Sequence, residues 1–150
     1  MKLAEALIKR ADLKARISQT ISRMKENAQV QEGDTPAEDV DELRINYEAM
    51  MEQLEGLIIS INKTNAETIL GEYSIAEAIA KRDCLKAKIA AYRNVREAAT
   101  SKGRRYSRTE IKNVSTIDIV DLQRIIDDYS KQYRELDTKI QQHNWITDLL

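Results

Sequence analysis

Apolar residues recur every three or four positions along two long stretches in the first half of the chain. The first stretch runs from about Lys2 to Ala28 and the second from about Ala37 to Glu67. This spacing places the apolar side chains on one face of a helix, so the pattern predicts two long helices. The positions on these faces are Leu3, Leu7, Arg10, Leu13, Ile17, Ile21 and Met24, and then Leu43, Tyr47, Met50, Leu54, Leu57 and Ile61.

The second half of the chain shows the same pattern. Ser74 and Glu77 have the spacing of a capping box, in which a hydroxyl and a carboxylate bind free amides at a helix start, and they predict the start of a third helix. A fourth helix is predicted to start at Ser115 or Thr116, with Asp118 in its first turn. The face positions are Ile75, Ile79, Arg82, Leu85, Ile89, Tyr92 and Arg96, and then Leu122, Ile126, Tyr129, Tyr133, Leu136 and Ile140.

Three segments interrupt this periodicity. Gly33 and Pro36 predict a tip between the first two helices, and Gly71 ends the second helical region. The segment 102–115 separates the third and fourth helices and is either extended or helical. We expect three of its apolar side chains to pack back on the helices: Tyr106, Ile111 and Val114.

The two halves also resemble each other residue by residue. Residues 77–89, EAIAKRDCLKAKI, match residues 5–17, EALIKRADLKARI, at an offset of 72, and residues 136–149 match residues 57–70 at an offset of 79. A single hairpin cannot bury its apolar faces alone, whereas two packed hairpins can. The sequence therefore predicts an all-α fold of four long antiparallel helices. We expect two similar hairpins, 1–70 and 74–150, that arose by internal duplication and form one elongated, coiled-coil-like bundle, a single domain over 1–150.

Several blocks of the sequence resemble one protein family. These blocks are MKLAEALIKRADL, VQEG followed by PAED, RYSRTEIKNVSTID and YRELDTKIQQHNW, and they cover nearly the whole chain. They resemble the septicolysin-like family of small bacterial helical proteins, whose function is essentially uncharacterised. The resemblance implies an all-helical fold. The family name alone suggests a cytolysin-like activity, and no catalytic or binding residue follows from it.

Composition narrows the function classes. The chain is 33% charged with a net charge of −1, so it has no overall attraction to nucleic acid or an anionic membrane. Its longest uncharged apolar run, residues 56–62, is far shorter than the roughly 20 residues of a membrane span. The first residues of the chain are charged and lack the apolar segment of an export signal. Cys84 is the only cysteine and cannot form a disulfide within the chain, so no oxidising compartment is required. We expect a cytoplasmic protein.

No catalytic, cofactor or metal site is predicted. A di-iron bundle needs Glu-x-x-His motifs, but Ile140 stands three positions before the sole histidine, His143. The acidic residues Asp34, Asp39 and Asp41 lack the central Gly and closing Glu of an EF-hand. Neither a Gly-rich phosphate loop nor zinc-ligand spacing occurs. We therefore expect no cofactor and no enzymatic activity.

Four polar residues fall on the apolar helix faces. Arg10 and Arg82 are equivalent in the repeat, and we expect buried ion pairs, with Asp137 as the first candidate partner, because an unpaired buried guanidinium is costly. The alternatives are an alkyl stem on apolar surface with its head in water, or two arginines that face an anionic ligand. Asn65 and Asn144 also match, and we expect them to fix helix register; capping or ligand binding is the alternative.

The two predicted tips carry opposite charges. The acidic tip contains Glu32, Asp34, Glu38 and Asp39. The basic tip, within 102–112, contains Lys102, Arg104, Arg105, Tyr106 and Arg108. Charged loops are usually only solvated, but basic residues beside a tyrosine are also typical of nucleic-acid contacts.

The surface pattern favours self-association. Large apolar residues fall beside the main stripes, and such surfaces are usually covered by a partner. They are Ile8, Ile45, Met51, Ile58 and Ile125. We therefore expect a non-catalytic scaffold or interaction protein that acts as a homo-oligomer, a dimer or higher, with the charged tips orienting the copies. The alternative is binding of nucleic acid or another anionic ligand through the basic tip.

Overall fold

Most of the described residues are helical. The structure, a computed structural model, describes residues 1–100, 111 and 113–150. Its elements are α1 (Leu3–Glu26), α2 (Val40–Glu67), β1 (Ile69–Leu70), β2 (Tyr73–Ser74), α3 (Ile75–Thr100) and α4 (Ile119–Ile146). The predicted all-α fold with four long helices is therefore confirmed, with one short β-hairpin that the sequence pattern did not indicate.

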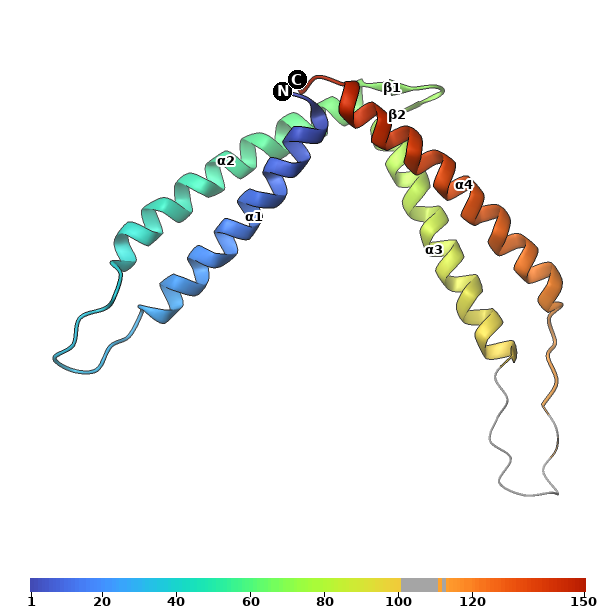
Figure 1. The fold of residues 1–150 in the computed structure, drawn as a ribbon, viewed down its shortest axis with the longest axis horizontal. Coiled ribbons are helices and arrows are strands. Elements are labelled where there is room, and N and C mark those ends of the chain that lie inside the picture. Colours follow the sequence, from blue (N-terminus) through green and yellow to red (C-terminus); the bar gives the residue numbers. More distant parts are fainter. Residues whose placement is uncertain (101–110, 112) are drawn as a thin grey trace.

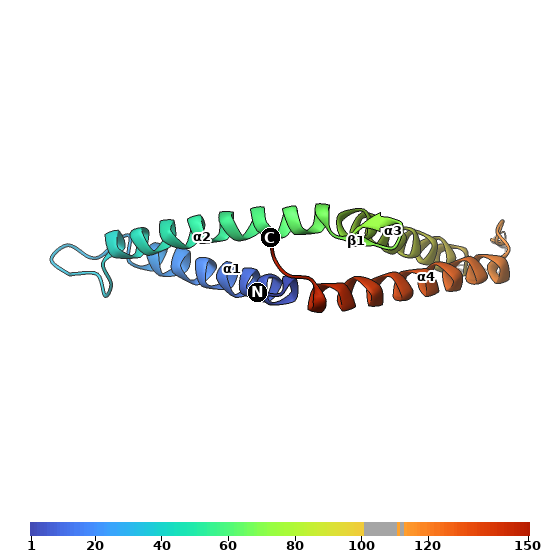
Figure 2. The same cartoon turned by 90° about the horizontal axis from the view of Figure 1, so that it is seen from above.

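The molecule has the shape of an inverted V (Figure 1). Helices α1 and α2 lie side by side in one arm, arm 1 (residues 1–70), and α3 and α4 form arm 2 (residues 74–150). The arms meet at an apex, where both chain ends also lie. Seen from above, the arms extend in opposite directions from this apex (Figure 2). The free ends of the two arms are therefore separated rather than adjacent.

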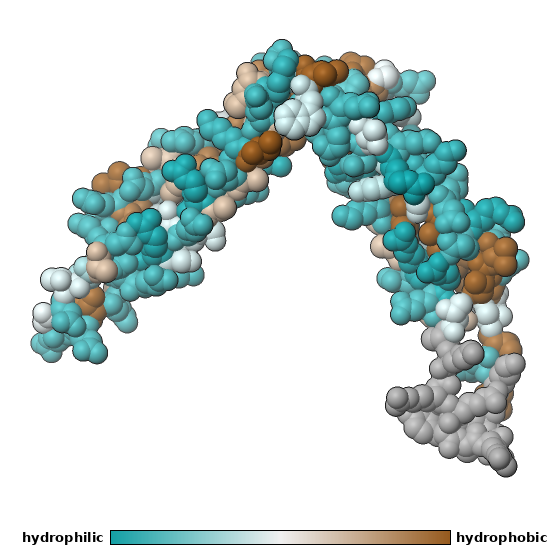
Figure 3. Space-filling view, viewed as in Figure 1, coloured by the Kyte–Doolittle hydropathy of each residue, from teal (hydrophilic) through white to brown (hydrophobic). Residues whose placement is uncertain are grey.

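Each arm has a core of its own. In arm 1 the buried cluster is Leu13, Ile17, Met50 and Leu54; in arm 2 it is Ile89, Leu122 and Ile126, with three tyrosines packed against it. Each helix thus buries one face against its neighbour in the same arm. The space-filling view shows mainly hydrophilic residues over both arms, with separate hydrophobic patches (Figure 3).

A third core joins the arms at the apex. It consists of Leu3, Ala6, Leu57, Ile61, Leu70, Ile75, Ala78 and Ile140, each at most 9% exposed. These residues come from all four helices and β1. Burial at the apex is therefore what connects the two halves.

The two connections at the apex use the same backbone hydrogen bond. Leu3 N–H donates to the Thr147 carbonyl at 2.9 Å, and Ile75 N–H donates to the Thr68 carbonyl at 2.9 Å. The donors are 72 positions apart and the acceptors 79, the two offsets of the sequence repeat. The start of α1 is thus bonded to the end of α4, and the start of α3 to the end of α2.

Extended pairing at the apex follows the same correspondence. Ile69 pairs with Ser74 in the β-hairpin, and Asp148 pairs with Lys2 in an isolated bridge at the chain ends. Lys2 Nζ also lies 2.9 Å from Asp148 Oδ1, and this contact lowers the pKa of Asp148. The chain ends therefore form the counterpart of the β-hairpin.

The helix starts at the apex are capped alike. Ser74 N–H donates to Glu77 Oε2 at 2.7 Å, as the predicted capping box requires, and Lys2 N–H donates to Glu5 Oε2 at 2.7 Å. Bonds from the Ser74 backbone and hydroxyl lower the pKa of Glu77. The capping box predicted at Ser74 is confirmed, and α1 has an equivalent carboxylate bond.

The predicted start of the fourth helix is wrong by a few residues. Asp118 is the N-cap of α4, since its carboxylate accepts the N–H groups of Val120 and Asp121 at 2.9 and 3.1 Å. Ser115, one of the two predicted starts, instead forms a local bond with Ile117. A carboxylate N-cap satisfies two free amides, which explains why the helix begins here.

Two other expectations along the chain are corrected. Helix α2 ends at Glu67, as predicted, but Gly71 does not end it. Gly71 lies in the loop of the β-hairpin with a φ of +69°, a value suited to the first loop position of a type II′ turn. Ile111 and Val114 are 95% and 74% exposed, so they do not pack back on the helices. Tyr106, expected to join them, lies outside the described residues.

Candidate interaction surfaces

Arg82 lies between α3 and α4 and contacts two carboxylates. Its Nη1 is 3.1 Å from Asp137 Oδ1, and its Nη2 is 2.8 Å from Asp83 Oδ1. The side chains of Arg82 and Asp137 are 23% and 33% exposed. Burial alone would lower the pKa of Arg82, but the bonds to Asp83 and Asp137 outweigh it and the pKa is raised. The structure thus brings Arg82 and Asp137 together in a partly buried ion pair.

Arg10, the equivalent residue of arm 1, differs from Arg82. It is half-buried and forms no ion pair with any described residue. The repeat explains this, because Ile58 and Ala11 stand where Arg82 has Asp137 and Asp83. The expected acidic partner of Arg10 is therefore wrong.

The two asparagines occupy equivalent places near the apex ends of α2 and α4. Asn144 is 5% exposed, and its Oδ1 has no hydrogen-bond partner within the described part of the chain. Asn65 is half-buried. Their proposed role in helix register stays a prediction.

Two residues of the acidic tip act locally. The Glu38 carboxylate accepts two hydrogen bonds from the Arg23 guanidinium, which lower the pKa of Glu38. Asp39 is the N-cap of α2 and accepts Asp41 N–H at 2.8 Å. Glu32 and Asp34 are exposed. The carboxylates of Glu38 and Asp39 therefore bind groups within arm 1.

The basic tip cannot be placed in the same way. Its residues Lys102, Arg104, Arg105, Tyr106 and Arg108 lie outside the described residues. The two arms nevertheless differ in net charge. Residues 1–70 contain 13 acidic and 9 basic residues, and residues 74–150 contain 11 acidic and 15 basic residues. The net charges are −4 and +4. A net charge summed over the whole chain conceals this asymmetry.

A groove of about 370 Å³ runs between α3 and α4 in arm 2. Lys86, Arg93 and Arg134 line it over an apolar floor that includes Ile89 and Tyr133. None of these three cations forms an ion pair with a described residue. Sequence reasoning missed this groove, although the spacing of Lys86 and Arg93, seven positions apart on one helix face, was a usable signal.

Large apolar side chains are exposed along arm 1. Ile8, Ile45 and Ile59 are each 60% exposed, and Met51 is 37% exposed. Ile58, predicted at an exposed edge, is half-buried against the core of arm 1. Ile125, predicted likewise, is also half-buried, so both of those predictions are wrong.

Two further observations concern the chemistry of the described residues. None of their helices has an apolar stretch that could cross a membrane. Within the same residues, no three His, Cys, Asp or Glu side chains are grouped so that they could hold a metal ion. The only cysteine of the chain, Cys84, is exposed on α3.

Fold and sequence place the chain in an all-α family. A family model described as "Family of unknown function (DUF6847)" matches residues 10–149, and the chain belongs to this family. It is similar to a crystal structure described as a functionally unknown conserved protein from Corynebacterium diphtheriae. That protein is 38% identical with a TM-score of 0.94, and the match covers 100% of this chain and 99% of that chain. The comparison with curated proteins finds no match.

The family assignment corrects the resemblance proposed from the sequence blocks. The matching family and the similar structure have no link to septicolysin-like proteins, so that resemblance is wrong. The cytolysin-like activity rested only on that family name and is dropped with it. The predicted helical fold does not depend on that resemblance, because the structure has four long helices.

Proposed function

We propose that the chain is a non-catalytic interaction protein that acts through self-assembly. The observation that carries this proposal is the exposure of Ile45 and Ile59, each 60% exposed on α2. The two side chains are fourteen residues apart, which places them on the same side of α2. An exposed helix side with large apolar side chains favours cover by a partner. Among the described residues, no further helix covers these positions of arm 1.

The repeat supports the same proposal. Three exposed isoleucines of arm 1 correspond to smaller or polar residues of arm 2: Ile8 to Ala80, Ile45 to Arg124 and Ile59 to Thr138. Arm 2 adopts the same helical hairpin without these isoleucines, so folding of an arm does not need them. We infer that the two arms descend from one duplicated hairpin and that arm 1 acquired an apolar contact surface afterwards.

We expect the double variant Ile45→Arg with Ile59→Thr to fold but to lose self-assembly. Both new residues are those of arm 2 at the equivalent positions, so the helices should tolerate them. Light scattering at micromolar concentration should give wild-type masses above the 17.2 kDa of one chain and the monomer mass for the variant. Circular dichroism should be unchanged. The matched control is Val120→Asp, which gives an exposed valine of α4 the residue found in arm 1 and should leave the assembly intact. A wild-type monomer would contradict the proposal.

A second function is favoured by the groove of arm 2. The groove has three cations without ion pairs to described residues, and its arm has a net charge of +4. These charges favour contact with an anionic polymer, and nucleic acid is the polymer to test. Sequence-independent binding of this kind is dominated by phosphate contacts and weakens steeply with salt.

We expect Arg93→Ile with Arg134→Glu to abolish retention of duplex DNA in a filter-binding assay at low salt. These are the residues of arm 1 at the equivalent positions, Ile21 and Glu55, so arm 2 should still fold. For the wild type, raising the salt concentration should weaken binding. Absence of binding by the wild type at low salt, or equal binding by the variant, would exclude this second function.

A further inference from the structure

The two arms differ at one level of their cores. In arm 2 the rings of Tyr92 and Tyr129 are stacked, with centroids 6.0 Å apart. The ammonium group of Lys88 lies 5.2 Å from the centroid of the Tyr129 ring. At this level arm 2 therefore has two stacked aromatic rings with a cation over one of them. Aromatic pairs of this kind are stabilising, and the electron-rich face of a ring attracts a cation.

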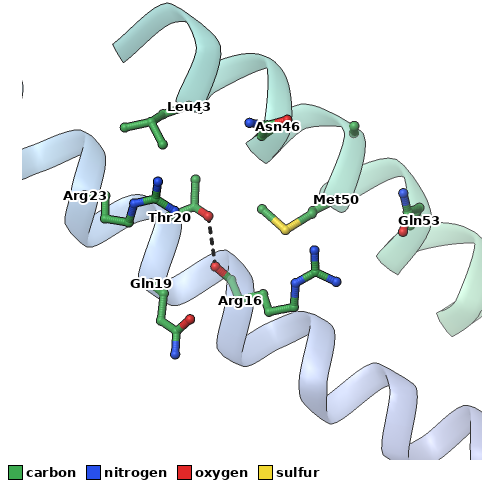
Figure 4. Close-up of a pocket in the computed structure, with 9 residues that line it drawn as sticks. Arg16, Gln19, Thr20, Arg23, Leu43, Asn46, Met50 and Gln53 are labelled. Atoms are coloured by element: carbon green, nitrogen blue, oxygen red, sulfur yellow. Dashed lines mark hydrogen bonds between the residues drawn. The ribbon is translucent and has the colours of Figure 1, made fainter. Parts of the chain in front are cut away.

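Arm 1 has no aromatic ring at the equivalent positions. Thr20, Met50 and Arg16 stand where arm 2 has the two tyrosines and the lysine. The Thr20 hydroxyl donates to the Arg16 carbonyl at 3.0 Å and so faces its own helix. A hollow of about 370 Å³ lies between α1 and α2 at this level, with Thr20 and Met50 among its lining residues (Figure 4).

The hollow combines an apolar floor with polar groups. Leu43 and Met50 line it from α2, together with the side-chain amides of Asn46 and Gln53. The Arg16 guanidinium forms no ion pair with a described residue. Arm 1 thus has a cation, Arg16, at the position of Lys88, but it has no aromatic ring at the position of Tyr129.

We propose that this hollow binds a small planar aromatic acid. The aromatic ring of the ligand occupies the place that the Tyr129 ring takes in arm 2, between Met50 and the Arg16 guanidinium. A planar guanidinium stacks on an aromatic face, and its charge attracts an anionic ligand. The amides of Asn46 and Gln53 donate to the carboxylate oxygen atoms. The volume lies within the range of small-ligand sites. This site is separate from the isoleucines proposed for self-assembly.

The proposal is tested first with benzoate and 4-hydroxybenzoate as probes. Titration of the wild-type chain, followed by amide NMR, should give saturable shifts at Arg16, Thr20 and Met50. Acetate, which has the acid without the ring, and phenol, which has the ring without the acid, should bind at least about tenfold more weakly. Absence of saturable shifts with both aromatic acids would overturn the proposal.

Filling the hollow with the residues of arm 2 provides the second test. Thr20→Tyr with Met50→Tyr should raise the melting temperature and abolish binding of 4-hydroxybenzoate, because the new rings occupy the site. Met51→Tyr, which adds the same side chain at the neighbouring exposed position, is the control and should leave binding unchanged. Arg16→Gln, at an exposed position that does not endanger folding, should weaken binding about tenfold or more. Unchanged affinity in the double tyrosine variant or in Arg16→Gln would overturn the proposal.

Discussion

Replacing Ile140 with alanine is expected to be one of the most destabilising single changes in this chain. The Ile140 side chain is 1% exposed and belongs to the apex core, to which all four helices contribute. Truncation of a buried isoleucine to alanine costs about 2–5 kcal/mol through lost burial and the cavity that remains. The same cost is expected for Ile61→Ala, since Ile61 is the equivalent residue of α2 and is also 1% exposed.

Denaturant unfolding followed by circular dichroism measures this effect. The control is Val120→Ala, on the same helix as Ile140 but 71% exposed and outside the proposed assembly surface, which should change the free energy of unfolding by only about 0.5 kcal/mol. If the alanine variants at positions 61, 120 and 140 lost similar stability, the apex would not be the core that holds the arms together.

The helices were predictable because their signals are local. Apolar spacing and the bonds from Ser74 to Glu77 involve neighbours in the sequence, and both are present in the structure. The divergence of the arms was not predictable from the same signals. It depends on pairing between Lys2 and Asp148 and on the β-hairpin at the apex, which are contacts between chain ends and across a turn. Helical periodicity contains no information on such contacts.

The site residues show the same distinction. Arg82 and Asp137 could be paired from the sequence because both positions follow from the apolar stripes of neighbouring helices. For Arg10 the expectation of a carboxylate partner follows from the cost of a buried unpaired guanidinium, but Arg10 is only half-buried and Ile58 stands where arm 2 has Asp137. The apolar pattern does not predict the hollow of arm 1, because the hollow lies where arm 1 lacks the two tyrosine rings of arm 2. A comparison of Thr20 and Met50 with the tyrosines of arm 2 would have indicated it.

Asp137→Ala is expected to destabilise the chain more than Arg82→Met does. Removal of the carboxylate leaves a guanidinium that is 23% exposed with Asp83 as its remaining acidic partner. An orphaned, partly buried charge costs about 1–3 kcal/mol, and the bonds to Asp83 place this case at the lower end. Methionine at position 82 instead fills the space with an apolar side chain and leaves Asp137 and Asp83, which are 33% and 58% exposed and can be hydrated.

Arg10→Met supplies the matched comparison, because Arg10 has the equivalent position without an ion pair to a described residue. We expect this change to be nearly neutral, and the double variant Arg82→Met with Asp137→Ala to recover part of the stability that Asp137→Ala alone loses. A double-mutant cycle on Arg82 and Asp137 measures the coupling directly. A coupling near zero would mean that solvent and Asp83 already satisfy the guanidinium. A loss in Arg10→Met as large as in Asp137→Ala would mean that packing of the arginine stems, and not the ion pair, stabilises this level of both arms.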